Sequence, residues 1–148
     1  MKARDIMTAD PQCVTLDDEL SRAAEIMRDV DVGIVPVVEN KDGMRLAGVI
    51  TDRDIAVRHV AEHHDGECKV RDHMTSGRID TVRPDADIDE IMTLMKRDQV
   101  RRVPVVEDGD RLVGIVAQAD LALDTGRSKR DEVAETVERI SEPVGARR

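Results

Sequence analysis

The chain has 148 residues, which is enough for one domain or for two small domains that share a core. It contains no Phe, Tyr or Trp, and its 32 acidic residues against 23 basic ones give a formal net charge of −9. This charge disfavours nucleic acid as a partner, because phosphate contacts need a surplus of Lys and Arg on one face. The missing aromatic residues also remove the stacking platforms on which single-strand binders depend.

Membrane and secretion signals are absent from the sequence. No apolar run approaches the roughly 18 residues of a membrane span, and the N-terminal segment MKARDIMTADPQ lacks the apolar core of a signal peptide. The two cysteines, Cys13 and Cys68, are too few for a disulfide framework. We therefore expect a cytoplasmic protein with reduced thiols and no membrane partner, and a disulfide between these two cysteines is the alternative.

The sequence consists of two similar halves. Residues 3–8 (ARDIMT) return at 70–75 (VRDHMT), and residues 13–39 align with 81–107 without a gap, with nine of 27 pairs identical. After a turn that is two residues shorter in the second half, RLAGVITDRDIAV (45–57) matches RLVGIVAQADLAL (111–123). The chain is therefore a tandem repeat of a unit of about 55 residues.

Each repeat begins with a short strand, around Val14 or Val82, that leads into a helix. The apolar residues of this helix recur at i, i+3, i+4 and i+7, which is the spacing of one buried helix face. They are Leu20, Ala23, Ala24 and Met27 in the first repeat and Ile88, Ile91, Met92 and Met95 in the second.

Two apolar runs follow the helix and are joined by a turn containing Asp-Gly, which predicts a β-hairpin. A second helix is predicted to begin near Asp52 and near Gln118. Pro36 and Pro104 cannot donate to a strand ladder, so we expect their strands to lie at a sheet edge or to start there. Each repeat is thus β-α-β-β-α, and one repeat alone is close to the size at which a core becomes marginal.

Three motifs resemble the cystathionine-β-synthase (CBS) domain: the Pro-Val-Val strand, the segment GVITDRD (48–54) and the Arg-Asp-x-Met-Thr lead-in. The pair resembles a Bateman module, and it is similar to stand-alone bacterial CBS pairs of the hypoxic-response type. The resemblance implies an α/β fold (α+β in some schemes) of two repeats packed sheet to sheet with pseudo-twofold symmetry. We place the first repeat at 1–62, a linker at 63–69, the second repeat at 70–124 and a C-terminal extension at 125–148.

Thr51 and Asp54 stand three residues apart where a predicted strand ends and a helix begins. Such a pair can cap the helix with no ligand at all. It can also offer a carboxylate to the vicinal hydroxyls of a ribose, beside free backbone N–H groups. On spacing alone, capping is the favoured interpretation.

The resemblance adds a ligand to this interpretation. In ligand-binding CBS pairs the equivalent Asp holds a ribose, the adenine lies between the repeats, and basic residues before the Pro-Val strand reach the phosphates. Planar guanidinium groups suit phosphate because they donate in pairs. The residues that match this main site are Thr51, Asp54, Ile79, Asp80, Thr81, Arg101 and Arg102.

The mirror-related second site is incomplete. Asp120 keeps the ribose carboxylate, but Ala117 replaces the threonine, and Gly33 and Ile34 stand where the arginine pair would be. We therefore expect this site to be weak or empty, or to take only the uncharged part of an adenosyl ligand.

All four histidines fall within residues 59–73, together with Cys68. His59 and His63 have i, i+4 spacing on the predicted second helix, which suits two zinc ligands, and Cys68 or His73 would supply a third. Because acidic residues surround them in a polar linker, we expect no physiological metal site here, with adventitious metal binding as the alternative.

After residue 124 the repeat ends. A basic turn, GRSKR, precedes a short helix with Val133, Val137 and Ile140 on one face. This stripe is predicted to cover either the repeats or a second subunit, and the basic turn is interpreted as facing solvent.

No catalytic motif is present: there is no phosphate-binding glycine loop, no nucleophile elbow and no plausible Cys/His pair. We therefore expect a regulatory module rather than an enzyme, with no required cofactor. Its regulatory ligand would be AMP, ADP, ATP or S-adenosylmethionine, and it would signal to an unidentified target protein or through a homodimer. The alternatives are a stress-related interaction scaffold without a ligand and a metal or redox sensor built on the His/Cys linker.

Overall fold

The structure, a computed structural model, describes residues 1–64, 66–77, 79–124 and 130–142. It divides into two compact units. The first-repeat unit comprises residues 11–79 and 108–112, and the second-repeat unit comprises residues 1–10, 80–107 and 113–148. These units differ from the repeat boundaries in the sequence, because each lead-in segment folds with the strands of the other repeat.

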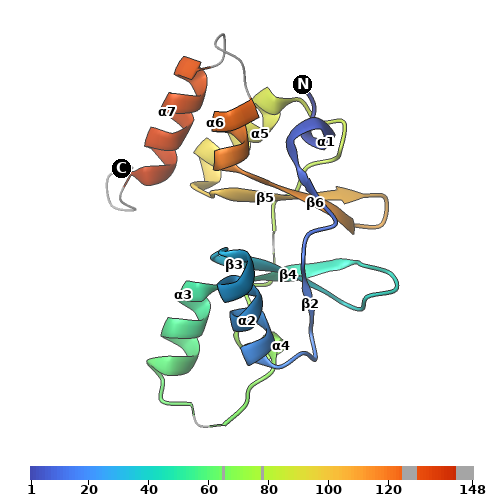
Figure 1. Cartoon of the computed structure of the whole chain (residues 1–148), viewed down its shortest axis with the longest axis vertical. Helices are drawn as coiled ribbons and strands as arrows, with labels where there is room; N and C mark the ends of the chain where they lie inside the picture. Colours follow the sequence, from blue (N-terminus) through green and yellow to red (C-terminus); the bar gives the residue numbers. More distant parts are fainter. Residues whose placement is uncertain (65, 78, 125–129, 143–148) are drawn as a thin grey trace. The chain divides into compact units, whose positions relative to one another are not determined.

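The first-repeat unit contains a three-stranded sheet in the order β2-β3-β4, with helices packed on it (Figure 1). Strand β2 runs parallel to β3, and β3 is antiparallel to β4. Its elements are β2 (Val14–Thr15), α2 (Leu20–Val30), β3 (Ile34–Val38), β4 (Leu46–Thr51), α3 (Asp52–Asp54), the π-helical segment η1 (Ile55–Val60) and α4 (Val70–His73).

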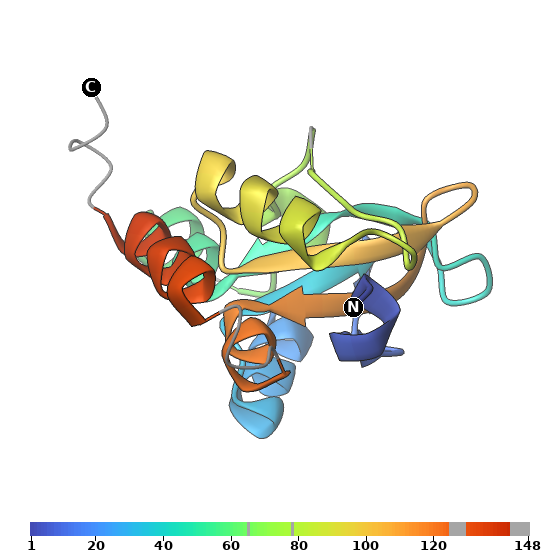
Figure 2. The same ribbon diagram turned by 90° about the horizontal axis from the view of Figure 1, so that it is seen from above.

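The second-repeat unit contains a sheet in the order β1-β6-β5, with β1 antiparallel to β6. Figure 2 shows α1 at the start of the chain and α7 near its end, both on this unit. Its elements are α1 (Ala3–Ile6), β1 (Thr8–Ala9), α5 (Ile88–Asp98), β5 (Arg102–Glu107), β6 (Arg111–Ala117), α6 (Gln118–Asp124) and α7 (Arg130–Ser141). The mixed helix and strand fold with two small sheets confirms the predicted fold class.

The predicted helix faces are correct in α5 and partly correct in α2. All four predicted residues of α5, Ile88, Ile91, Met92 and Met95, are buried. In α2 the buried residues are Leu20, Ala23 and Ile26, whereas Ala24 is exposed. The buried face of α2 is therefore turned toward Ile26, and Ala24 lines a cavity instead.

The proline prediction is wrong for Pro36 and holds only in part for Pro104. Pro36 lies in β3, the central strand of its sheet, and Pro104 lies in β5, which has β6 on one side and only the isolated parallel bridge from Val82 to Val105 on the other. Pro36 is tolerated there because β2 is only two residues long and pairs with Val37 and Val38, beyond the proline.

Each lead-in segment lies against a glycine of a hairpin strand. A Cβ atom on Gly48 would collide with the Met74 side chain and the Thr75 carbonyl, and one on Gly114 would collide with the Met7 side chain. Val49 and Thr75 exchange backbone hydrogen bonds of 2.9 and 3.1 Å across this close approach. The glycines are therefore required so that the lead-in segments can pair with the strands.

Helix α7 extends the core of the second-repeat unit. It packs against α5 and α6 (Figures 1 and 2), and it buries Val133, Thr136 and Ile140, with Val137 partly buried. The apolar stripe predicted from the sequence thus covers this unit. Apart from Arg130, the basic turn lies outside the described residues. Among the described residues, no helix has the length and apolar character of a membrane span.

Candidate functional site

Thr51 and Asp54 form the capping box that their spacing predicts. The Asp54 amide donates to Thr51 Oγ1 at 3.0 Å, and the Thr51 amide donates to Asp54 Oδ2 at 3.0 Å. Thr51 is the last residue of β4 and Asp54 lies in the first turn of α3. The pair therefore joins strand to helix whether or not a ligand is present.

The Asp54 carboxylate has further partners within the first-repeat unit. The Thr75 hydroxyl lies 3.3 and 3.2 Å from its two oxygens, and Arg58 Nε lies 3.6 Å from Oδ1. Asp54 as a whole is 8% exposed. A carboxylate can accept about four hydrogen bonds, so Asp54 is a nearly buried acceptor held in one orientation that retains some capacity for a hydroxyl donor.

The counterpart in the second-repeat unit is half of this arrangement. Asp120 Oδ2 accepts a hydrogen bond from the Ala117 amide at 2.7 Å, but Ala117 has no hydroxyl with which to cap the Asp120 amide. The departure seen in the sequence is thus a missing half of the capping box.

The arginine pair lies where β5 begins, in the same unit as Asp120. The Arg101 carbonyl accepts a hydrogen bond from the Gln118 amide at 2.9 Å, and Arg102 begins β5 in the same unit. In the first-repeat unit the matching contact runs from the Asp52 amide to the Gly33 carbonyl, also at 2.9 Å. A Cβ at Gly33 would lie 3.1 Å from Asp52, so the backbone there approaches the start of α3 closely.

The predicted main site draws on both units. The first-repeat unit holds Thr51, Asp54 and Ile79, and the second-repeat unit holds Asp80, Thr81, Arg101 and Arg102. Asp80 is paired with Arg97, with Nη2 and Oδ2 separated by 3.5 Å. Within single units the structure brings together Thr51 with Asp54 and Ala117 with Asp120. The assembly of the complete site, and of the second one with Ile34, stays a prediction.

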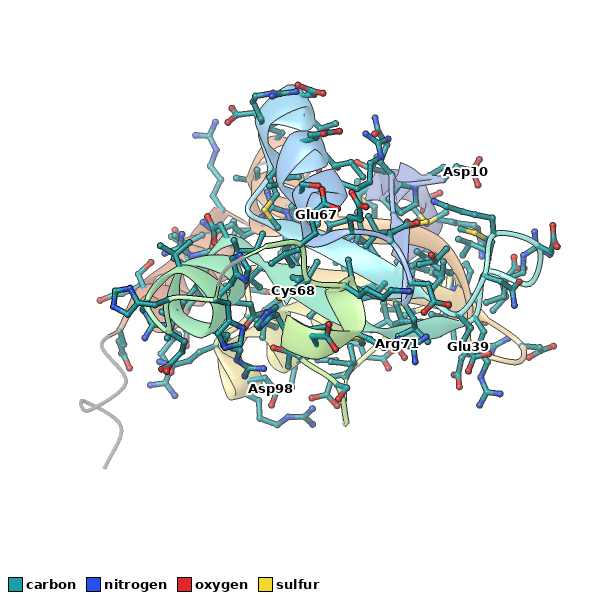
Figure 3. The ribbon with its side chains drawn as sticks, turned by 90° about the horizontal axis from the view of Figure 1, so that it is seen from below. Asp10, Glu39, Glu67, Cys68, Arg71 and Asp98 are labelled. Carbon is teal, nitrogen blue, oxygen red and sulfur yellow. The ribbon has the colours of Figure 1, made fainter. Side chains whose placement is uncertain are left out.

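A group of four metal-binding side chains lies wholly within the first-repeat unit. The ligand atoms of His59, His64, Cys68 and His73 all lie within 4.8 Å of one another. His59 belongs to η1, His73 ends α4, and the other two lie in the segment between them. Figure 3 shows Cys68 in this connecting segment, next to Glu67. We call these four residues the His/Cys group.

The sequence prediction named His63 in this role, and the structure places His64 there instead. The reason is the π-helical turn: the Ala61 amide bonds to the Ala56 carbonyl at 2.9 Å, and the His64 amide to the His59 carbonyl at 3.2 Å. Both hydrogen bonds span five residues rather than four, so the residue at i+5 lies over His59. His63 has a positive φ of 54° and is exposed, outside the group.

The three histidine rings of this group lie close together, and two of them have an unsatisfied ring nitrogen. The ring centroids of His59 and His64 are 5.8 Å apart, and each lies 5.1 Å from the centroid of His73. His59 Nδ1 and His73 Nε2 are buried and have no hydrogen-bond partner among the residues that the structure describes. Burial, followed by the neighbouring His59 and His64, lowers the pKa of His73 below its ordinary value, which favours the neutral ring that binds metals.

The donor set fits zinc. Three imidazoles and one thiol are ordinary ligands of a tetrahedral zinc centre, in which ligand atoms lie roughly 3.5 Å apart. Cys68 Sγ lies 3.9 Å from His64 Nδ1, and the group, whose ligand atoms lie within 4.8 Å of one another, would draw together around a metal ion. Cys68 and Cys13 are both free thiols in this structure.

One signal in the sequence could have identified this group. When the two lead-in segments are aligned, His73 stands where the first copy has Ile6. Ile6 is buried in an apolar core, and His73 is only 4% exposed. A histidine at a core position of an otherwise similar repeat indicates a polar function at that position.

An apolar cavity adjoins the His/Cys group. It has a volume of about 170 Å³ and lies between α2 and the segment that carries Cys68. Its lining residues are Leu20, Ser21, Ala24, Ile55, His59, Gly66, Glu67 and Cys68. Two of the four ligand residues thus form part of its wall.

Comparison with known proteins gives the same family for both repeats. The model of the CBS domain matches residues 3–59 and 70–123. Hypoxic response protein 1 of Mycobacterium tuberculosis is 41% identical over 120 residues, which cover 81% of this chain and 82% of that protein.

Two solved structures are informative. A crystal structure described as hypoxic response protein I with two coordinated zinc ions aligns with a TM-score of 0.76 and 38% identity, over 85% of this chain and all of that one. The CBS pair of protein MJ0100, in complex with 5′-methylthioadenosine and S-adenosyl-L-methionine, aligns with a TM-score of 0.69 and 28% identity, over 82% of this chain and 93% of that one.

Proposed function

Because the chain belongs to the CBS-domain family, with a CBS domain in each repeat, we propose that it is a regulatory ligand-binding module whose first-repeat unit holds a zinc ion. The observation that carries this proposal is the His/Cys group, in which four ligand atoms from η1, α4 and the segment between them lie within 4.8 Å. The zinc ions in the structure of hypoxic response protein I support it.

The four side chains have distinct tasks in such a site. His73 and His59 each present a buried ring nitrogen without a partner in the described part of the chain, so a metal ion would remove the cost of leaving these atoms unsatisfied. His64 and the Cys68 thiolate complete the set from the connecting segment. With four protein ligands the site is closed, which is typical of zinc that stabilises a fold rather than zinc that activates water.

The test of this function is stoichiometric metal binding by the untagged full chain. Metal analysis and calorimetric titration with Zn²⁺ should give one tightly bound ion per chain. His73→Ile, which installs the residue that the first lead-in segment has at Ile6, should lose the ion, and the matched control His63→Ala should keep it. Substoichiometric zinc in the native chain, or equal loss in both variants, would refute the proposal.

A second ligand class is favoured by a separate observation, the nearly buried Asp54 carboxylate fixed by Thr51 and Thr75. We propose that this carboxylate accepts the hydroxyls of an adenosine-containing ligand, and that Arg101 and Arg102 donate to its phosphates. The complex of the MJ0100 CBS pair with two adenosine derivatives supports this ligand class. A ligand with different affinities for two conformations would shift their populations, which is the mechanism of signalling.

Calorimetric unfolding with AMP, ADP, ATP or S-adenosylmethionine tests this ligand class. A ligand at about 100 times its Kd should stabilise the chain by roughly 2.7 kcal/mol. The double variant Arg101→Ala/Arg102→Ala should abolish the effect of a phosphorylated ligand, while Asp120→Ala should change it far less. Equal loss in Asp120→Ala would contradict the difference between the two sites, and no stabilisation by any of the four would contradict the ligand class.

The remaining expectations concern partners. Within this proposal the chain forms a homodimer and acts on a separate target protein, and light scattering at micromolar concentration should show the dimer. An interaction scaffold without any small ligand is the alternative, and it predicts that neither zinc nor an adenosine compound changes the stability of the chain.

A further inference from the structure

The His/Cys group and the Asp54 carboxylate are built on the same two elements, η1 and α4. Arg58 and His59 are neighbours in η1, and His73 is followed directly by Met74 and Thr75. His59 and His73 belong to the His/Cys group, whereas Arg58 and Thr75 contact Asp54. The two sites are therefore adjacent within one compact unit.

Arg58 makes the direct connection. Its Nη1 donates to the Met74 carbonyl at 3.2 Å and lies 3.5 Å from the His73 carbonyl, while its Nε lies 3.6 Å from Asp54 Oδ1. Thr75 closes the loop, since its hydroxyl contacts both Asp54 oxygens and its amide bonds to the Val49 carbonyl of β4. Arg58, which joins η1 to the end of α4, therefore also contacts the Asp54 carboxylate and helps to orient it.

From these contacts we infer that zinc binding at the His/Cys group orders the Asp54 carboxylate through Arg58, so that the metal and the adenosine ligand bind with positive coupling. The inference rests on the proposed zinc function. Arg58 is a positioning residue in this arrangement: it touches neither ligand and joins the segments that hold them.

The physical reason lies in what the metal-free group must tolerate. Without a metal, two buried ring nitrogens stay unsatisfied, and the separation of η1 from α4 would expose them to water. The η1 segment is π-helical, a conformation that proteins use only in short stretches. A metal ion that joins η1 to α4 would oppose local opening of this corner, and such opening breaks the hydrogen bond from Arg58 to Met74 that supports Asp54.

Amide hydrogen exchange tests the coupling directly, because the Thr51 and Asp54 amides are the donors of the capping box. Zinc should slow the exchange of both amides by at least about 5-fold, the lower end of typical coupling factors. The Ala117 amide, which donates to Asp120 in the other unit, is the internal control and should not change.

Variants separate the coupling from zinc binding itself. Arg58→Ala should bind one zinc ion, as measured by metal analysis, yet lose the slowing at Thr51 and Asp54. Arg58→Lys should recover part of it, and the exposed neighbour Arg53 provides the control Arg53→Ala, which should behave as the native chain. If an adenosine compound binds, zinc should tighten its Kd by the same factor by which that compound tightens the Kd for zinc.

The outcomes distinguish the inference from the function on which it rests. One bound zinc ion with unchanged exchange at Thr51 and Asp54, or with slowing that persists in Arg58→Ala, overturns the coupling and leaves the metal site intact. Equal nucleotide Kd values with and without zinc also overturn the coupling. A chain that binds no stoichiometric zinc overturns both.

Discussion

The two repeats close the same corner of the fold by different chemistry. In the first-repeat unit, His73 stands beside η1 and the segment carrying His64 and Cys68, and the corner is polar. In the second-repeat unit, the equivalent Ile6 is buried in an apolar cluster, to which α7 adds Val133 and Ile140. The same sequence pattern thus tolerates either a ligand set or packed side chains at this corner, and the surrounding segments decide which one forms.

Removal of zinc should give the largest loss of stability, and it should destabilise only the first-repeat unit. A chelator should lower the free energy of unfolding by about 4 kcal/mol if zinc is present at 1,000 times its Kd. Circular dichroism during urea unfolding, with and without chelator, measures the change. The same chelator should leave His73→Ile unaffected, and an equal response of that variant would break the comparison.

Truncation in α7 should give the next largest effect, and it should be independent of metal. Ile140→Ala removes a side chain that is 6% exposed in the apolar cluster, and such truncations cost about 3 kcal/mol. The same unfolding experiment measures it, and Val137→Ala, at a partly buried position, should cost less. If Ile140→Ala lowered the free energy of unfolding only in the presence of zinc, the stabilities of the two units would not be independent.

The helix caps at Thr51 and at Ala117 provide a further comparison between the two units. Thr51→Ala removes the hydroxyl that accepts from the Asp54 amide, which should cost about 1 kcal/mol. Ala117→Thr supplies the missing hydroxyl in the second repeat and should add a similar amount. Urea unfolding midpoints at constant slope report both changes. A loss in Ala117→Thr would mean that the second carboxylate is not placed to be capped by this residue.

The smallest expected effect concerns the lead-in lysine. Lys2 donates to Asp87 at 2.6 Å on the surface, and this hydrogen bond lowers the pKa of the Asp87 carboxyl. A carboxyl whose pKa is lowered on folding stabilises the fold above its ordinary pKa, and the contribution disappears as the pH falls through the folded value. Lys2→Ala should therefore raise the pKa of Asp87 in an NMR titration and, because the pair is exposed, lower the unfolding midpoint only slightly at neutral pH. An unchanged pKa would show that Lys2 does not interact with the Asp87 carboxyl in solution.

The sequence predicts the parts of this fold that depend on local pattern. Spacing and residue type over a few positions are enough to predict the repeat, the helix positions and the hairpin turns. They also predict the capping role of Thr51 and Asp54. The buried face of α5 is correct because its apolar side chains are large, whereas Ala24 of α2 is too small for its burial to be predicted from periodicity.

The errors lie where backbone geometry departs from the regular case. A helix with four-residue hydrogen bonds would pair His59 with His63, and the five-residue bonds of η1 select His64 instead. Pro36 sits in a central strand because its neighbour β2 is too short to need its missing donor. The exchange of lead-in segments depends on contacts between residues far apart in the chain, such as Thr8 with Ile115. No local pattern encodes such contacts.

That exchange also sets the order in which the protein can be completed during synthesis. The first-repeat unit draws almost all its residues from positions 11–79, so it can fold as soon as that stretch has left the ribosome. Residues 1–10 emerge before residues 11–79, yet their partner strand β6 (Arg111–Ala117) follows that stretch. Strand β1 must therefore wait unpaired until β6 has been made, and the second-repeat unit is completed only after residues 11–79 are available to fold.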